Sequence, residues 1–156
     1  MNLPKKMLIG SDHAGFALKE ALIKHLVKKG IKVRDEGTCS IDSCDYTDFA
    51  AIVAGKVSRK RFSRGILICK SGIGNSIIAN RFPGVRAALC YNKEVAKLCR
   101  EHNDSNILVL GAGFVPPKDA KEMVDIWLKT DFTGGRHKRR LDKIKKTEEL
   151  IRGDRF

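Results

Sequence analysis

Five short, continuous apolar runs, separated by helical patterns, constrain the fold of this chain more than any other feature. The runs are MLIG (7–10), IKV (31–33), ILIC (66–69), VRAALC (85–90) and ILVLG (107–111). Runs without polar alternation are typical of strands buried on both faces, as in a parallel sheet. Between them apolar residues recur at helical spacing, as at Leu18, Ala21, Leu22 and Leu26. This alternation predicts an α/β fold with a doubly wound, five-stranded parallel sheet and helices on both faces.

Length and composition fit one domain. The chain has 156 residues and is 42% hydrophobic, which is enough for a core and too apolar for a disordered chain. No apolar run approaches the roughly 18 residues of a membrane span. The first residues, MNLPKKMLIG, lack the features of a signal peptide. We therefore expect a single domain over 1–156, no membrane association and a cytoplasmic location.

Cysteine usage argues against a disulfide framework and against a metal site. The five cysteines are Cys39, Cys44, Cys69, Cys90 and Cys99. Their number is odd, and no signal peptide accompanies them. No C-x-x-C pair occurs, and the histidines do not fall at zinc-finger spacing. The sequence therefore predicts no structural metal.

The net charge of +13 would attract an anion, either nucleic acid or a small anion such as a sugar phosphate, but the spread of the charge along the chain is also typical of a surface that is basic throughout. Aromatic residues are only 6% of the chain, and no known nucleic-acid-binding motif occurs. A nucleic-acid-binding module is therefore the less favoured alternative. The basic C-terminal segment, 131–156, includes a charge-rich helix predicted over 141–151 with one narrow apolar stripe. Such a stripe suits docking on a partner or on the edge of its own domain.

Polar residues follow the predicted strands, where open α/β sheets bind ligands. Ser11-Asp12-His13-Ala14-Gly15 follows the first strand, Asp45-Tyr46 precedes the second long helix, and Cys69-Lys70-Ser71-Gly72-Ile73-Gly74-Asn75-Ser76 follows the third strand. Gly72 and Gly74 favour a tight turn whose N–H groups point outward at a helix start, which would bind an anion. The turn is neither a dinucleotide fingerprint nor a P-loop. Alone, it is most simply an ordinary turn.

Cys69 makes a chemical role for this turn more attractive. A buried cysteine is usually a small hydrophobe. At a strand end, facing N–H groups and next to Lys70, its thiol would have a lowered pKa and would serve as a nucleophile or a proton-transfer base. Cys90 and Cys99 have no such turn beside them and are interpreted as packing residues.

Other polar clusters allow two interpretations. Asp12-His13 is either an acid–base pair or a helix N-cap with a surface histidine. His102-Asn103-Asp104 is predicted in a helix-to-strand loop, and His25 is interpreted as structural. The run GGRHKRR (134–140) is either a solvated charge cluster or a phosphate clamp.

Taken together, these segments resemble the type B ribose-5-phosphate isomerases, a group that also includes galactose-6-phosphate isomerase subunits. The matching segments are GSDHAGFALK, DYTDFA, GILICKSGIGNSIIANRFPGVRAAL, REHNDSNILVLG and GGRHKRR. They run in family order from about Met7 to Arg140. Each is weak alone, but their combination is specific.

The resemblance implies a Rossmann-like sheet and a sugar-phosphate isomerase without metal or cofactor. It also implies a homodimer or a dimer of dimers with shared active sites, in which the C-terminal segment reaches the neighbouring subunit. Cys69 matches the base that moves a proton through an enediolate, and His102 matches the residue that opens the furanose ring. The implied catalytic residues are Asp12, Cys69, Ser71 and His102, and the implied substrate-binding residues are His13, Tyr46, Gly72, Ile73, Gly74, Asn75, Asn103, Arg136 and Arg140.

Two positions depart from the family pattern. Lys70 stands where glycine commonly follows the cysteine, and Gly113 stands where an arginine often follows the fifth strand. We hypothesise that Lys70, His137 or Arg139 compensates for the missing phosphate contact. The favoured function is interconversion of ribose 5-phosphate and ribulose 5-phosphate. The alternatives are isomerisation of allose or galactose 6-phosphate, a nucleic-acid-binding module, and an inactive sensor of sugar phosphates.

Overall fold

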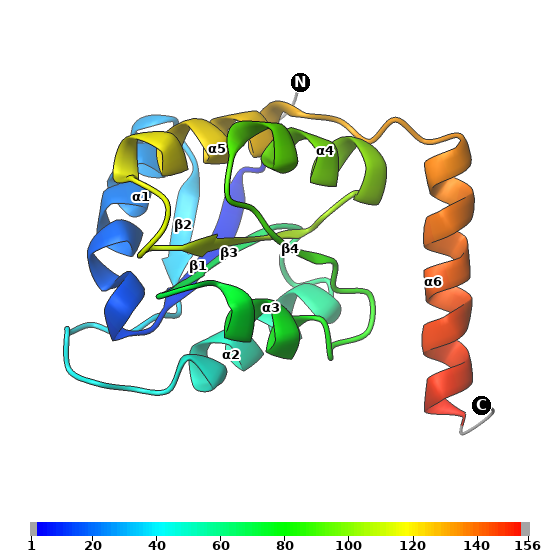
Figure 1. Cartoon of the computed structure of the whole chain (residues 1–156), viewed down its shortest axis with the longest axis horizontal. Coiled ribbons are helices and arrows are strands. Elements are labelled where there is room, and N and C mark those ends of the chain that lie inside the picture. Colours follow the sequence, from blue (N-terminus) through cyan, green and yellow to red (C-terminus); the bar gives the residue numbers. More distant parts are fainter. Residues whose placement is uncertain (1–2, 154–156) are drawn as a thin grey trace.

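The computed structural model describes residues 3–153 and shows a parallel sheet between two layers of helices (Figure 1). The strands are β1 (Lys6–Ser11), β2 (Lys32–Asp35), β3 (Gly65–Cys69), β4 (Ala87–Leu89) and β5 (Ile107–Gly111). The helices are η1 (His13–Gly15, a 3-10 turn), α1 (Phe16–Lys28), α2 (Tyr46–Ser58), α3 (Ile73–Ala79), α4 (Lys93–Asn103), α5 (Pro117–Lys129) and α6 (Arg136–Arg152). The sheet has the order β2-β1-β3-β5-β4 and every pairing is parallel, which confirms the predicted fold class.

Side chains of the three central strands contribute to two hydrophobic cores, one on each face of the sheet. Successive side chains of a strand point to opposite faces. Met7 and Ile9 of β1 therefore pack with α1, α4 and α5, whereas Leu8 packs with α2 and α3 on the other face. β1, β3 and β5 are almost entirely buried, which explains why their runs lack polar alternation.

The two edge strands differ from the prediction of burial on both faces. β2 exposes Lys32 and Arg34, and β4 is only half-buried. Each has a neighbouring strand on one side only. Charged side chains on an edge discourage pairing with another sheet.

Two helix boundaries also differ from the prediction. α4 extends through His102 and Asn103, which were predicted in a loop, and ends where Asp104 takes a left-handed φ of 45°. α6 begins at Arg136, ahead of the predicted segment 141–151, directly after Gly134 and Gly135 at positive φ. The basic run therefore lies mostly on the first turns of a helix.

The strand order locates the place where a ligand is expected. The chain passes from β1 to β2 on one side, and then returns to β3 on the other side of β1. The connections that follow β1 and β3 therefore leave the sheet in opposite directions, which opens a crevice at their carboxyl ends.

Candidate active site

Backbone hydrogen bonds tie the loops together at the carboxyl ends of β1, β3 and β5. The N–H of Asp12 donates to the carbonyl of Ile68 at 3.4 Å, and that of Ala112 donates to the carbonyl of Cys69 at 2.9 Å. Nine of the residues singled out in the sequence lie here, and we call them the carboxyl-edge cluster: Asp12, His13, Tyr46, Cys69, Ser71, Gly72, Ile73, Gly74 and Asn75. The fold thus brings together segments more than fifty residues apart.

Cys69 is the last residue of β3 and is almost completely buried, at 4% exposure. The N–H of Gly72 donates to its Sγ at 3.2 Å, which holds the sulfur against the turn. Gly72 has a φ of +82°, and a Cβ there would lie 2.4 Å from Leu89 Cδ1. Only glycine fits this position without strain, so the contact to the sulfur depends on it.

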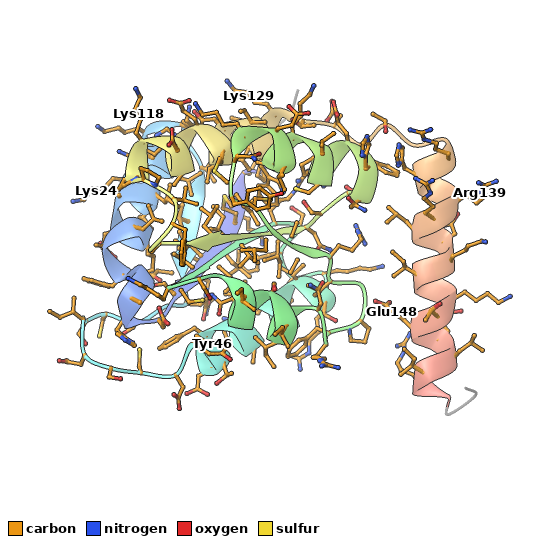
Figure 2. All side chains as sticks on the ribbon, viewed as in Figure 1. Lys24, Tyr46, Lys118, Lys129, Arg139 and Glu148 are labelled. Carbon is orange, nitrogen blue, oxygen red and sulfur yellow. The ribbon has the colours of Figure 1, made fainter. Side chains whose placement is uncertain are left out.

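Fewer N–H groups of the turn are available to a ligand than the sequence suggested. The N–H of Ile73 donates to Ser71 Oγ at 3.3 Å, so the first two N–H groups both meet side chains of the cluster. Gly74 is helical, and a Cβ there would lie 2.4 Å from Tyr46 Cζ. Gly74 is thus required for close approach of the Tyr46 ring, which lies beside α3 in Figure 2. It is not required for the turn itself, which corrects our interpretation of the second glycine.

Asn75, in the first turn of α3, has a buried carboxamide that residues 3–153 leave without a hydrogen bond. It is 1% exposed, and neither atom of its carboxamide has a hydrogen-bond partner among residues 3–153. Buried polar groups are nearly always paired, because leaving one unpaired costs about 1–3 kcal/mol. The hydroxyl of Ser11, at the end of β1, is also buried and has no partner within the described residues.

Asp12 and His13 are both held by backbone N–H groups. The carboxylate of Asp12 caps η1 by accepting the N–H of Gly15 at 3.0 Å, so the capping interpretation is correct for its position. His13 Nδ1 accepts the N–H of Cys44 at 3.2 Å, which leaves the ring proton on Nε2. The contact with Cys44 was missed, because nothing in the loop 36–45 marks that residue for a histidine.

The remaining predicted residues lie at the opposite edge of the sheet. We call His102, Asn103, Arg136 and Arg140 the amino-edge cluster. The carbonyl of Asn103 accepts the Nε–H of Arg86, immediately before β4, at 3.0 Å. The ring of His102 stacks on that of His137, with centroids 4.2 Å apart and planes 6° from parallel. This stack places the first turn of α6 beside the end of α4.

The His102–His137 stack also has an electrostatic consequence. Burial of His137, together with its neighbours His102, Arg136 and Arg140, lowers the pKa of its imidazole below the ordinary value. The ring is therefore mostly neutral at pH 7, which suits close stacking on another histidine. The sequence indicated only that His137 belongs to a basic run.

A single chain does not bring the two clusters together. β3 joins the two edges with five residues, which at a rise of about 3.3 Å per residue separates them by roughly 13 Å. α4 packs on one face of the sheet and runs back toward the amino edge, so His102 ends on the far side from Cys69. In Figure 1, α6 stands at one side of the sheet, opposite the loop between β2 and α2.

Two grooves run along α6, away from the carboxyl-edge cluster. Their volumes are about 920 and 580 Å³, and Leu141 and Ile144 line both. Ile144 is 48% exposed and Ile151 is 61% exposed. The predicted apolar stripe is therefore only partly covered by its own domain.

Cys90 and Cys99 are buried as predicted, but they are not simple packing residues. Their sulfurs lie 3.7 Å apart, and Cys99 Sγ also contacts Ser105 Oγ at 3.1 Å. The hydrogen bonds from Cys90 and Ser105, with Arg100 and Arg64 nearby, outweigh burial and lower the pKa of the Cys99 thiol to about 7. His25 is structural as interpreted, since its Nε2 lies 2.7 Å from an Asp125 carboxylate oxygen.

Residues 3–153 contain neither a membrane-spanning helix nor a metal-binding cluster. No helix there is long and apolar enough to cross a bilayer. No group of three or more His, Cys, Asp or Glu side chains is arranged to hold a metal ion. The carboxyl-edge and amino-edge clusters remain the candidate site.

Comparison with known proteins agrees with this description. The sequence model described as Ribose/Galactose Isomerase matches residues 7–144. Ribose-5-phosphate isomerase B of Escherichia coli strain K12 is 43% identical over 145 residues, which cover 93% of this chain and 97% of that protein. A Clostridium thermocellum ribose-5-phosphate isomerase B structure superposes with a TM-score of 0.92 at 47% identity, covering 94% of this chain and 99% of that one. The Mycoplasma genitalium ribose-5-phosphate isomerase B structure, solved with bound ribulose-5-phosphate, gives 0.90 at 42% identity over 92% of this chain and 96% of that one.

Proposed function

This chain belongs to the Ribose/Galactose Isomerase family and is an isomerase, and we propose that it interconverts ribose 5-phosphate and ribulose 5-phosphate. Relatives at 42–43% identity carry that activity in their names, and one was solved with ribulose-5-phosphate bound. The observation within this chain that carries the proposal is the setting of Cys69, a buried thiol held by the N–H of Gly72, in a turn followed three residues later by the buried Asn75, whose carboxamide has no hydrogen-bond partner among residues 3–153.

Aldose–ketose exchange requires a base at the substrate carbons and donors for a developing oxyanion. Cys69 removes the proton from C2 of the open-chain aldose and returns a proton to C1 of the enediolate. The N–H groups of Gly72 and Ile73 already donate to Cys69 and Ser71, so the Ser71 hydroxyl and the N–H of Gly74 are the donors that stabilise the enediolate oxygens. Neither the donor nor the acceptor of the Asn75 carboxamide is paired among residues 3–153, so both can bind a sugar hydroxyl.

The other residues bind the sugar and its phosphate. His102 opens the furanose ring, assisted by Asn103, while Asp12 and Tyr46 hold sugar hydroxyls. His13 presents an Nε2–H donor to the phosphate. Arg136 and Arg140 are exposed cations on the first turns of α6 and supply the remaining positive charge.

These roles require two copies of the chain. The carboxyl-edge cluster of one subunit faces the amino-edge cluster of its partner, and a two-fold axis then creates two equivalent sites. The partly exposed apolar stripe of α6 and the grooves beside it offer a surface for the partner. We therefore propose a homodimer, alone or paired as a dimer of dimers. Arg136 and Arg140 lie on the C-terminal segment, and we assign them, together with His102 and Asn103, to the partner subunit.

The chain forms a single domain over 1–156, of which 131–156 is the basic segment that reaches the neighbouring subunit. The enzyme works in the cytoplasm, in the non-oxidative pentose phosphate pathway, whose substrates are phosphorylated and do not cross membranes freely.

The direct test is conversion of ribose 5-phosphate by the purified protein in the presence of a chelator. We expect turnover by the wild type and a loss of about 10²- to 10⁴-fold in kcat for Cys69→Ala, as is typical when a general base is removed. Cys39→Ala is the matched control, because Cys39 is exposed on a loop. Wild-type activity on allose or galactose 6-phosphate but not on ribose 5-phosphate would contradict the proposed substrate.

A further inference from the structure

Lys70 and Gly113 lie against each other at the carboxyl edge of the sheet. Lys70 follows β3 directly, and Gly113 follows β5 by two residues. The N–H of Gly113 donates to the Lys70 carbonyl at 2.9 Å. A Cβ at Gly113 would lie 2.8 Å from Lys70 Cε and 3.2 Å from its Nζ. The lysine side chain therefore runs across the glycine, and the two departures from the family pattern are neighbours in space.

Backbone conformation does not explain the glycine at 113. The glycines of this chain that need a positive φ are Gly30, Gly72, Gly84, Gly134 and Gly135, and Gly113 is not among them. Nor would a side chain there meet rigid backbone, because the three atoms nearest to its Cβ all belong to the flexible end of Lys70. What glycine provides at 113 is room for the lysine.

The ammonium of Lys70 is available to an anion. Lys70 is exposed, and no carboxylate among residues 3–153 forms an ion pair with it. Other exposed lysines, such as Lys24 and Lys118, also have no ion pair among residues 3–153, so what distinguishes Lys70 is its place directly after Cys69. An unpaired cation placed one residue after the proposed base would attract a dianionic phosphate ester strongly.

We propose that Lys70 is a phosphate-binding residue of the site, and that the absence of a side chain at Gly113 leaves the space that positions its ammonium. This inference rests on the proposed function and deepens it. Lys70 is a cation from the same chain as Cys69, whereas Arg136 and Arg140 come from the partner. The other two candidates for compensation fit less well. His137 stacks on His102 at the amino edge, and Arg139 points away from the body of the chain in Figure 2.

The test compares Lys70→Gln, Gly113→Ala and the double variant by steady-state kinetics, with inorganic phosphate as a competitive inhibitor. Loss of a charge-assisted contact should raise the KM for ribose 5-phosphate and the inhibition constant of phosphate about 10- to 100-fold, with kcat within about twofold. Gly113→Ala should raise both constants less, because it displaces the ammonium and does not remove it. In the Lys70→Gln background it should have no effect, since no ammonium remains to displace.

The controls separate this role from others. Lys24→Gln removes the same charge from an exposed position in the second half of α1, outside both clusters, and should change neither constant. Lys70→Arg should retain most of the phosphate affinity. If Lys70→Gln leaves both constants unchanged, or shifts only the pH–rate profile, Lys70 is not a phosphate ligand. If Gly113→Ala raises KM equally in the wild-type and Lys70→Gln backgrounds, Gly113 does not position the Lys70 ammonium.

Failure of the proposed function is distinguishable from failure of this inference. A wild-type protein that does not convert ribose 5-phosphate contradicts the proposed function. Lys70 would then be tested by calorimetric titration of the wild type and Lys70→Gln with inorganic phosphate. Equal affinities would overturn the inference, and weaker binding by Lys70→Gln would support it.

Discussion

The two edges of the sheet carry the two halves of the proposed site, and they differ in how deeply their side chains are buried. At the carboxyl edge, Cys69 and Asn75 are at most 4% exposed, and backbone N–H groups fix both Cys69 and Asp12. At the amino edge, Arg136 and Arg140 are exposed on a helix that stands at the side of the domain.

This difference follows from what each half has to do. A base must sit within hydrogen-bonding distance of one carbon, so a small displacement is costly. A cation attracts a phosphate over several ångströms and tolerates looser placement. The proposed proton transfer thus lies at buried strand ends, whereas the proposed charge recognition lies on an exposed helix.

The largest effect should come from separating and recombining the two edges. Cys69→Ala and His102→Ala should each lose about 10²- to 10⁴-fold in activity. Refolding an equal mixture should restore about a quarter of wild-type activity, because half of randomly formed dimers pair the two variants and each of these holds one intact site. A mixture of Cys69→Ala with Ser71→Ala is the control and should stay inactive, since both changes affect the same edge. Equal inactivity of the two mixtures would refute the shared site.

The next largest effect is on the free energy of unfolding, when a glycine at one edge is replaced and compared with a glycine at the other. Gly72→Ala combines a left-handed backbone with a clash against Leu89 and should destabilise the fold by about 2–4 kcal/mol. Gly134→Ala also has a positive φ, of +68°, but its Cβ would meet nothing within 4 Å, so about 1 kcal/mol is expected. Urea unfolding midpoints measure both. Equal losses would mean that packing at the carboxyl edge is no tighter than at the amino edge.

A smaller change is expected at Asn75, and its sign is diagnostic. Replacing the buried, unpartnered carboxamide by Leu should stabilise the free protein by about 1 kcal/mol, because the desolvation penalty disappears. The same change should raise the KM for ribose 5-phosphate, since a substrate contact is lost. Thermal unfolding and steady-state kinetics test the two parts. A less stable variant with unchanged KM would show that the amide serves the fold and not the ligand.

The smallest effect concerns pH at the amino edge. His137 has a lowered pKa in the folded protein, so the unfolded chain binds its proton more readily. The stabilising contribution of the His102–His137 stack is therefore fully present above the ordinary histidine pKa of about 6.5 and is lost as the pH falls below it. The hydrogen-exchange protection factors of the amides in the first turns of α6, taken relative to the intrinsic exchange rate at each pH, should be lower at pH 5.5 than at pH 7.5. His137→Phe, which stacks without titrating, should remove most of this difference; an unchanged difference would contradict the role of His137.

Much of the fold was predictable, because local patterns and burial on both faces leave direct marks on a sequence. The continuous runs of β1, β3 and β5 predicted buried parallel strands, and these are the strands with helices on both faces. The same inference was wrong for β2 and β4, because edge position depends on strand order, which no local pattern encodes. His102 was predicted in a loop because a polar run resembles one, whereas the Asn92 cap and the left-handed Asp104 carry α4 past it.

The sequence by itself determined the residue types of the site and the strand ends that carry them, because parallel strands must end at a common edge. It also singled out Lys70 and Gly113 as unusual. Only the tertiary structure decided which of these residues meet. Contact between Lys70 and Gly113 depends on β3 and β5 being adjacent, and the distance of His102 from Cys69 depends on the direction in which α4 crosses the sheet. Both are long-range consequences of packing, which is why they are invisible in a list of motifs.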